Sequence, residues 1–377
     1  LKLNQFLMLF MVLALSVVLA ACGGDDAADD SNTDSNDSGD TTESTGSKEL
    51  NLVINSEPPS LHPGLATDTT SSTILQQTHE GLMIMKNGEP TPAIAESYEV
   101  SEDQLTYTFK LRDAKWANGD AVTAEDFVYS WKWALNPENA SEYASILYSI
   151  KGAQAYNNGE GTADEVAVKA IDEKTLEVTL AQPTPYFLEL TAFKTYSPIH
   201  QATSEANDKW FAEAETHIGN GAYKITEWIH SGNIVLEKNE NYWDAANVKI
   251  DKVNIEMVES ETTQMNKFNG DEIDFLGVNF GSIPLDALDG LKADGTLNVA
   301  EYTGVYMYKF NTTDKVMSNV NIRKALAMAI NREELIKNIT KGEQHVALGL
   351  VPSSVEGFGD DEGYFKDGDF AAAKELL

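Results

Sequence analysis

Hydrophobic and polar residues alternate with the period of a β-strand in several short stretches that begin near residue 50. Leu50, Leu52 and Ile54 alternate with polar residues, and residues 105–111 repeat the pattern with Leu, Tyr, Phe and Leu. This alternation predicts strands with one face in the core and one face in solvent. Three further strands are predicted at 176–180, 234–236 and 253–258.

Helices are predicted where apolar residues recur every three or four positions behind a capping residue. Thr123 is a suitable N-cap with Asp126 three residues later, and the apolar stripe that follows should end before Pro137. A shorter helix is expected to open at 68–72 and to run through Gln77. Strands and helices do not alternate regularly as in a doubly wound or barrel fold, so the pattern indicates α/β of irregular order, or α+β.

The last part of the chain carries more helix signals. A long helix should begin at Asn321. It should restart at Asn331, with Glu334 as a capping-box-like partner, and stop at Gly342. Asp369 is an N-cap for a final helix that no glycine or proline closes. We therefore expect a truncated sequence.

The chain opens with an apolar run, 6–21, that is too short for a comfortable membrane span and has the length of the apolar part of a secretory signal. Leu19, two alanines and Cys22 follow each other and resemble the lipobox of bacterial lipoproteins. The resemblance implies that the Cys22 thiol takes a diacylglyceryl group, becomes the mature N-terminus and tethers the protein outside the cytoplasm. The alternative is a buried free cysteine at the edge of a hydrophobic segment.

The composition narrows the possible partners and the architecture. The 377 residues include 27 Lys and Arg against 60 Asp and Glu, for a net charge of −33. Such a surface disfavours nucleic acid, because binding it needs cations that neutralise phosphates. The length favours at least two domains or lobes, and one cysteine permits no disulfide within the chain. Residues 23–47 lack aromatic and large aliphatic residues and should form a solvated acidic spacer.

Motifs for catalysis or metal binding are not evident. No two of the six histidines have the spacing that places them on one helical face, so no zinc site is predicted. Phosphate-binding glycine loops and a Gly-x-Ser-x-Gly elbow are also missing; Gly219-Asn220-Gly221 lacks the third glycine of a phosphate cradle. We predict no enzyme, no cofactor and no metal. A glycosidase with paired carboxylates stays as the alternative from another class.

Tyrosines mark one further stretch. Tyr302, Tyr306 and Tyr308 fall on one face of a period-two segment. Such a tyrosine-lined strand could lie in the core or form the wall of a cleft for an extended ligand.

Several distinctive segments follow each other in order along residues 50–377: 56–63 (Ser-Glu-Pro-Pro-Ser-Leu-His-Pro), 115–120 (Lys-Trp-Ala-Asn-Gly-Asp), 219–223 (Gly-Asn-Gly-Ala-Tyr), 241–243 (Asn-Tyr-Trp) and 323–326 (Arg-Lys-Ala-Leu). Together they resemble family 5 solute-binding proteins, the extracytoplasmic receptors of ABC importers for oligopeptides, dipeptides and nickel. Residues 129–131 and 183–187 look closest to the oligopeptide-binding branch.

The resemblance implies a two-lobed, clam-like receptor with an extra subdomain in its first lobe. The implied limits are a signal peptide at 1–21, a lipid-anchored acidic linker at 22–47, lobe I at 48–79 and 202–302, the extra subdomain at 80–201, and the start of an incomplete lobe II at 303–377. The acidic residue that holds the peptide amino group in such receptors is expected beyond this sequence.

Few ligand-binding residues can be transferred by resemblance. The expected peptide-binding residues are Thr67, Asp68, Thr69, Tyr143, Asn279, Tyr302, Gly304 and Tyr306. At 67–69 an extended peptide would pair backbone to backbone, as in strand addition. Tyr143 would face the cleft from the extra subdomain. Gly304 lies at the lobe crossover, where enteric relatives have a cysteine, so no cleft disulfide is possible.

We therefore expect a monomeric, lipid-anchored receptor that closes on short peptides and delivers them to an ABC importer permease. Within the same family, a nickel chelate, haem, an oligosaccharide or a peptide pheromone are the alternative ligands.

Overall fold

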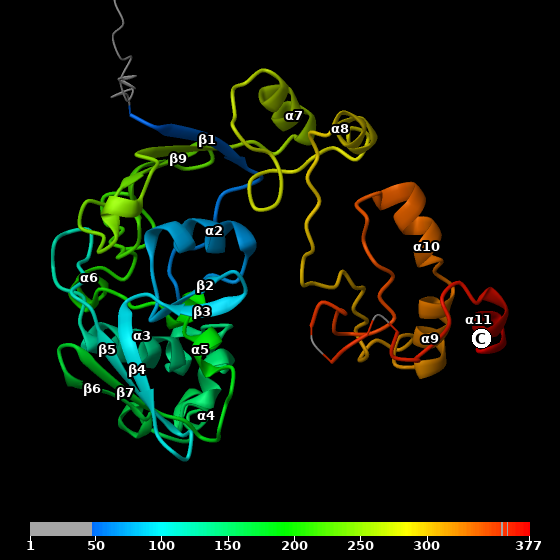
Figure 1. Ribbon diagram of the computed structural model, residues 1–377. Helices are drawn as coiled ribbons and strands as arrows, with labels where there is room; N and C mark the ends of the chain where they lie inside the picture. The colour runs from blue at the N-terminus through cyan, green and yellow to red at the C-terminus, as the bar shows by residue number, and fades with distance from the viewer. Residues whose placement is uncertain (1–46, 356, 360) are drawn as a thin grey trace, which may run out of the picture. The chain divides into compact units, whose positions relative to one another are not determined.

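Two four-stranded sheets, each with its own hydrophobic core, form the framework of the protein (Figure 1). The computed structural model describes residues 47–355, 357–359 and 361–377. Cys22 and the spacer up to residue 46 lie outside the described residues. Within the described part, no helix is long and apolar enough to cross a membrane.

The first sheet joins strands from distant parts of the sequence. Its order is β1 (Glu49–Ile54), β10 (Lys252–Met257), β9 (Asn233–Lys238) and β8 (Tyr223–Ile229). β1 is parallel to β10, and the other pairs are antiparallel. Helix α2 (Thr69–Thr78) packs on β8, and its buried residues form one hydrophobic core with the apolar face of the sheet. The strands predicted at Leu50, 234–236 and 253–258 are confirmed.

The second sheet is antiparallel. Its order is β4 (Ala95–Val100), β5 (Thr106–Leu111), β7 (Thr175–Thr179) and β6 (Val168–Asp172). A separate hairpin, β2 (Met83–Lys86) with β3 (Glu89–Pro92), precedes it. The alternation at 105–111 and 176–180 predicted β5 and β7 correctly.

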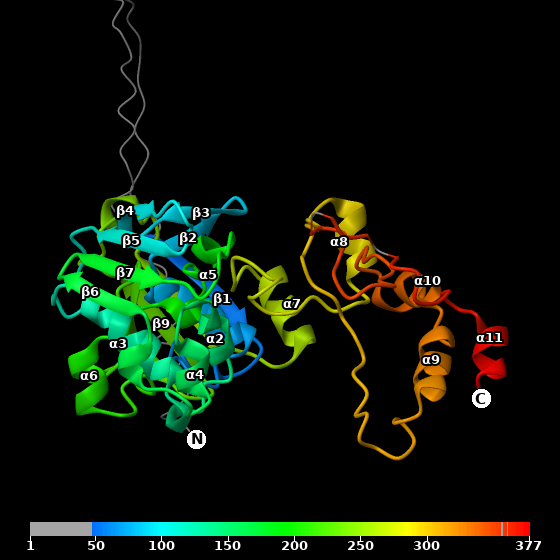
Figure 2. The ribbon, with the colours of Figure 1, turned by 90° about the horizontal axis from the view of Figure 1, so that it is seen from below.

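Helix α3 (Ala124–Leu135) packs on β6 and β7 (Figure 2). Its capping box is formed, because Thr123 and Asp126 each bond the backbone of the other. Trp131 is fully buried in this second core, and its indole N–H donates to the Tyr196 carbonyl at 2.9 Å. The helix ends at Leu135 with Asn136 as its C-cap, before Pro137, as predicted.

Shorter elements connect the two sheets and continue the chain after them. The remaining α-helices are α4 (Ala153–Asn157), α5 (Phe187–Leu190), α6 (Gln201–Ala206), α7 (Glu261–Asn269), α8 (Leu288–Asp294), α9 (Val320–Met328), α10 (Arg332–Leu335) and α11 (Phe370–Glu375). The 3₁₀ turns are Pro137–Asn139, Ala144–Ser149, Ala163–Glu165, Lys194–Tyr196 and Ala245–Asn247.

The helices after residue 300 begin behind capping residues as expected, but two of their predicted limits were wrong. Helix α9 starts at Val320, one residue before the predicted position, because Asn319 accepts a hydrogen bond from the Asn321 N–H and is the N-cap. Asn331 caps α10 as predicted, but the π-helical turn that follows ends at Lys341, whose φ of 53° is left-handed, and not at Gly342. Asp369 caps α11 as predicted.

Residues 301–310 form no strand. The period-two tyrosine pattern is therefore wrong as a predictor of a β-strand here, since no segment of the described chain pairs its backbone with this stretch.

The segment Gly219-Asn220-Gly221 packs closely against the backbone at the end of α2 and just after it. A Cβ on Gly219 would lie 1.9 Å from the Thr78 carbonyl oxygen, so only glycine fits. The Asn220 amide accepts from the Glu80 N–H at 3.0 Å and donates to the Glu80 carbonyl at 2.9 Å. These glycines serve backbone approach and not phosphate binding.

The Glu80 carboxylate is buried at this junction. It accepts hydrogen bonds from the Tyr242 hydroxyl at 2.7 Å and the Trp243 indole at 2.6 Å. The Arg112 guanidinium lies over the Trp243 ring, 3.6 Å from its centroid. Burial raises the pKa of Glu80, while the two hydrogen bonds oppose the rise.

Candidate functional site

The loop between β1 and α2 is held by side chains that come from the segment after α3. The Tyr143 hydroxyl donates to the Thr67 carbonyl at 3.2 Å, and the Ser141 hydroxyl donates to the Gly64 carbonyl at 2.5 Å. The Trp133 ring packs against the same loop, 3.9 Å from the ring of His62. Two of the predicted site residues, Thr67 and Tyr143, are therefore in direct contact, although 76 positions separate them.

The next two predicted residues begin helix α2. Asp68 has an extended backbone, with φ −102° and ψ 165°, and its carboxylate accepts from the Ser71 N–H at 2.7 Å. Thr69 is the first helical residue, and its carbonyl accepts from the Thr73 hydroxyl at 2.9 Å. Because strand addition needs an extended backbone, Thr69 is not available for it, and the segment that can pair with a peptide ends at Asp68.

A lysine that the sequence reasoning missed lies beside this contact. Lys194 begins a 3₁₀ turn that packs against α2. Its ammonium lies over the Tyr143 ring, 5.1 Å from the centroid, and over the Phe193 ring at 4.6 Å. The Tyr143 and Phe193 rings are themselves 5.7 Å apart. Partial burial lowers the pKa of Lys194, and the nearby Asp68 charge opposes that shift.

The other predicted site residues are exposed and are not linked to this contact. Asn279 has a left-handed φ of 71° in a tight turn closed by two hydrogen bonds between Gly277 and Phe280. Tyr302 is 73% exposed and Tyr306 is 91% exposed. Gly304 packs so closely on the Tyr302 ring that a Cβ would lie 2.6 Å from it. Among the described residues, no hydrogen bond or ring contact joins them to Thr67 or Tyr143.

Three histidines far apart in the sequence meet in the interior. The His79 and His217 rings are 5.2 Å apart, and the Trp210 ring lies 5.5 Å from His62 and 5.7 Å from His217. The Gly64 N–H donates to His62 Nδ1, so in the neutral ring the proton is on Nε2. Burial lowers the pKa of His62 to about 3 and that of His217 to about 4.

This cluster has unused polar atoms but does not form a metal site. His62 Nε2, His79 Nε2 and both His217 ring nitrogens have no hydrogen-bond partner among the described residues. Over the same residues, no group of three or more potential metal ligands is arranged to hold an ion. Helical spacing in the sequence could not reveal the cluster, because each histidine comes from a different segment.

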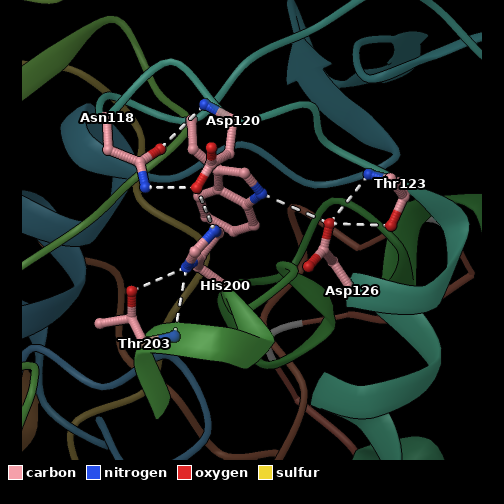
Figure 3. Close-up of polar contacts among 7 residues, drawn as sticks. Asn118, Asp120, Thr123, Asp126, His200 and Thr203 are labelled. Atoms are coloured by element: carbon pink, nitrogen blue, oxygen red, sulfur yellow. Dashed lines mark hydrogen bonds and ion pairs between the residues drawn. The ribbon is translucent and has the colours of Figure 1, made fainter. Parts of the chain in front are cut away.

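One further constellation has the residue types of a catalytic triad. The His200 ring contacts Asp120 Oδ2 through Nε2 at 3.1 Å and Thr203 Oγ1 through Nδ1 at 2.7 Å (Figure 3). The same Nδ1 accepts from the Thr203 N–H at 3.3 Å, so His200 is the N-cap of α6. In a triad the acid holds Nδ1 and the nucleophile faces Nε2, which is the reverse of this order. The arrangement therefore caps a helix.

Asp126 has an equally structural role nearby. Its carboxylate accepts from the Thr123 N–H, the Thr123 hydroxyl and the Trp116 indole (Figure 3). These bonds complete the capping box of α3 and fix a fully buried tryptophan.

Comparison with known proteins identifies the family of this chain. A sequence profile of the bacterial extracellular solute-binding proteins, family 5, middle part, matches residues 89–377, which is more than half of the chain. The chain belongs to this family. Family 5 membership, predicted from the motifs, is thereby confirmed, and so is the mixed α/β fold, which is that of two-lobed binding proteins.

Individual family 5 relatives match most of this chain. The oligopeptide-binding protein OppA of Bacillus subtilis (strain 168) is 49% identical over 371 residues, covering 97% of this chain and 67% of that protein. The dipeptide-binding protein DppE of the same strain is 39% identical, covering 90% of this chain and 61% of that protein. The solved structure of Listeria monocytogenes OppA bound to peptide has a TM-score of 0.77 and 32% identity, covering 88% of this chain and 67% of that chain. The chain thus spans 61–67% of the length of these three relatives.

Proposed function

We propose that this family 5 protein is an extracytoplasmic receptor that binds short peptides and delivers them to the permease of an ABC importer. The observation that carries the proposal is the 49% identity with an oligopeptide-binding protein over 97% of the chain. The similarity to a family member solved with bound peptide supports it.

The proposed mechanism is closure of two lobes around an extended ligand, which couples binding to the shape that the permease recognises. The receptor backbone at Thr67 and Asp68 would pair with the peptide main chain, so affinity would depend little on peptide sequence. Tyr143 would form one wall of the site, and Asn279, Tyr302, Gly304 and Tyr306 would line other parts of the closed cleft.

The domain limits remain as the resemblance implied them: a signal peptide at 1–21, a linker at 22–47, lobe I at 48–79 and 202–302, the extra subdomain at 80–201 and the start of lobe II at 303–377. In support, one core cluster draws its buried residues from 52–75 and 223–255, and a second draws them from 82–196. The junction at Glu80 and Gly219 lies where these two sets meet in the sequence.

Calorimetric titration of the protein with peptides of two to five residues tests the proposal. We expect binding to many sequences. A folded protein that binds none of them would contradict the peptide function. Nickel chelates, haem, oligosaccharides and peptide pheromones, titrated in parallel, test the alternative ligands of the family. Turnover of a glycoside would support the enzyme alternative, which no motif or described constellation favours.

We propose further that Cys22 carries a lipid that holds a monomeric receptor at the extracytoplasmic face of the cell membrane, either in the periplasm or on the outer surface of the cytoplasmic membrane. The lipobox-like residues before Cys22 support this assignment. Cys22→Ser should move the protein from membrane fractions to soluble fractions without changing peptide affinity. Retention of the whole variant in the membrane would contradict the anchor.

A further inference from the structure

The Lys194 ammonium lies in surroundings that suit the binding of an anionic ligand group. It lies over two aromatic rings, those of Tyr143 and Phe193, so the cation stands beside the side chain whose hydroxyl binds the Thr67 carbonyl. Aromatic faces attract a cation, but they accept no strong hydrogen bond from its three N–H groups. The rings therefore position the ammonium and leave its N–H groups able to bind an anion.

The charge of Lys194 is not balanced by an ion pair. No carboxylate of the described residues lies within salt-bridge distance of it, although the chain carries 60 acidic residues. The charged side chain that acts on it is Asp68, whose carboxylate already accepts the Ser71 N–H as the cap of α2. A half-buried cation without a partner is unfavourable until an anion reaches it.

We propose that Lys194 makes the receptor selective for peptides that present a carboxylate, either the C-terminus or an acidic side chain, beside the Thr67–Tyr143 contact. This inference rests on the proposed peptide function and adds a ligand preference to it. The carboxylate would accept hydrogen bonds from the Lys194 ammonium. These bonds would replace the hydrogen bonds to water that the two rings prevent.

The expected preference is substantial because the hydrogen bond is charge-assisted and partly shielded from water. Charge-assisted hydrogen bonds are roughly twice as strong as neutral ones, and a tenfold change in Kd corresponds to about 1.4 kcal/mol. We therefore expect about tenfold tighter binding of a peptide with the carboxylate than of its neutral counterpart. The preference should weaken at high ionic strength, since the site is only half-buried.

Two peptide pairs, titrated into the intact protein, separate the two sources of the carboxylate. One pair is tri-alanine as free acid and as C-terminal amide; the other is Ala-Glu-Ala amide and Ala-Gln-Ala amide. Lys194→Met removes the charge and keeps an apolar stem on the rings, whereas Lys194→Arg keeps the charge. The control is Lys169→Met, which removes an exposed lysine from the edge strand β6.

The wild type, Lys194→Arg and Lys169→Met should each show the preference in at least one pair, and Lys194→Met should bind both members of each pair equally. If Lys194→Met does not fold, as judged by its thermal unfolding, Lys194→Gln takes its place. Equal binding of all four peptides by the wild type, or a preference that persists without the charge, would overturn the role of Lys194. If the wild type binds none of the peptides, the proposed peptide function itself fails.

Discussion

Residues 48–276 and residues 284–377 carry equally clear local signals but differ in how much they bury. Three core clusters draw all their buried residues from the first region. In the described part of the second region, the buried apolar residues are Ala325 and Ala373, whereas large side chains such as Tyr306 and Phe370 are mostly exposed. Both regions have helices with side-chain N-caps, for example at Asp68 and Asp369. Caps therefore decide where a helix begins, and burial decides what holds it in place.

The largest expected effect separates the two regions by removing an aromatic side chain from each. Trp131→Ala should lower the free energy of unfolding by about 3–5 kcal/mol, because it leaves a cavity in the core and an unpaired Tyr196 carbonyl. Phe370→Ala, at a position that is 60% exposed, should change it by less than about 0.5 kcal/mol. Urea denaturation measures both. Equal losses would show that the two regions are packed alike.

A second pair compares one glycine from each region. Gly219→Ala should destabilise the protein by about 2–3 kcal/mol, because the new Cβ would overlap the Thr78 carbonyl oxygen. Gly290→Ala, in α8 with no atom within 4 Å of the added Cβ, should stabilise by about 0.5–1 kcal/mol. Thermal unfolding of both variants gives the comparison. A neutral Gly219→Ala would mean that the junction at Glu80 is loose.

The pH dependence sharpens the contrast between buried and exposed groups within the first region. Since burial lowers the pKa of His217 to about 4, the unfolded chain binds more protons than the folded one below the ordinary histidine pKa of 6.5. Stability should therefore fall with pH from about 6.5 to about 4, by up to about 1.4 kcal/mol per pH unit for this group. Denaturation at several pH values should give a shallower slope for His217→Phe. An unchanged slope would mean that His217 is not buried as a neutral ring.

His230 should change the free energy of unfolding with pH in the opposite direction to His217, and by a smaller amount. Hydrogen bonding to Glu57 raises its pKa, and its side chain is 49% exposed. Its contribution is complete below 6.5 and is lost as the pH rises through the folded-state value. His230→Gln should thus flatten a slight decline of stability above neutral pH. A steeper decline in the variant would contradict the assigned Glu57 contact.

The last comparison concerns the two kinds of site tyrosine. Tyr143→Phe removes the hydroxyl that binds the Thr67 carbonyl and should cost about 0.5–1.5 kcal/mol of stability. Tyr302→Phe should leave stability unchanged, because the side chain is exposed and its hydroxyl makes no hydrogen bond to the described residues. Denaturation of the two variants side by side measures the difference. The same loss in both would mean that the Thr67 contact adds nothing.

Period and capping in the sequence were sufficient to predict five of the ten strands in the described residues and the starts of five helices: β1, β5, β7, β9 and β10, and α2, α3, α9, α10 and α11. The alternation at 105–111 gave β5, and Thr123 with Asp126 gave the start of α3, because both signals act within a few residues. The tyrosines at 302–308 show the limit of this reasoning. A period-two pattern needs a partner strand to become a sheet, and the described chain supplies none.

The site depended on contacts that no local pattern contains. The motifs placed Thr67 and Tyr143 in it by resemblance, but they did not include Lys194, which lies within an ordinary Phe-Lys-Thr-Tyr run. The buried histidines were missed for the same reason, since they come together only in the folded chain. A lysine next to an aromatic residue is common in sequences, so only the position of Tyr143 in the fold distinguishes this one.

Hydrogen–deuterium exchange with and without a tight-binding short peptide tests the central claim most directly, because it measures ligand binding and its location together. The proposed function predicts slower exchange in the loop before α2, around Tyr143 and in the turn that begins at Lys194, with little change on the edge strand β6. Binding of the peptide without protection of these three segments would contradict the site, and no change anywhere with any peptide would contradict the receptor function.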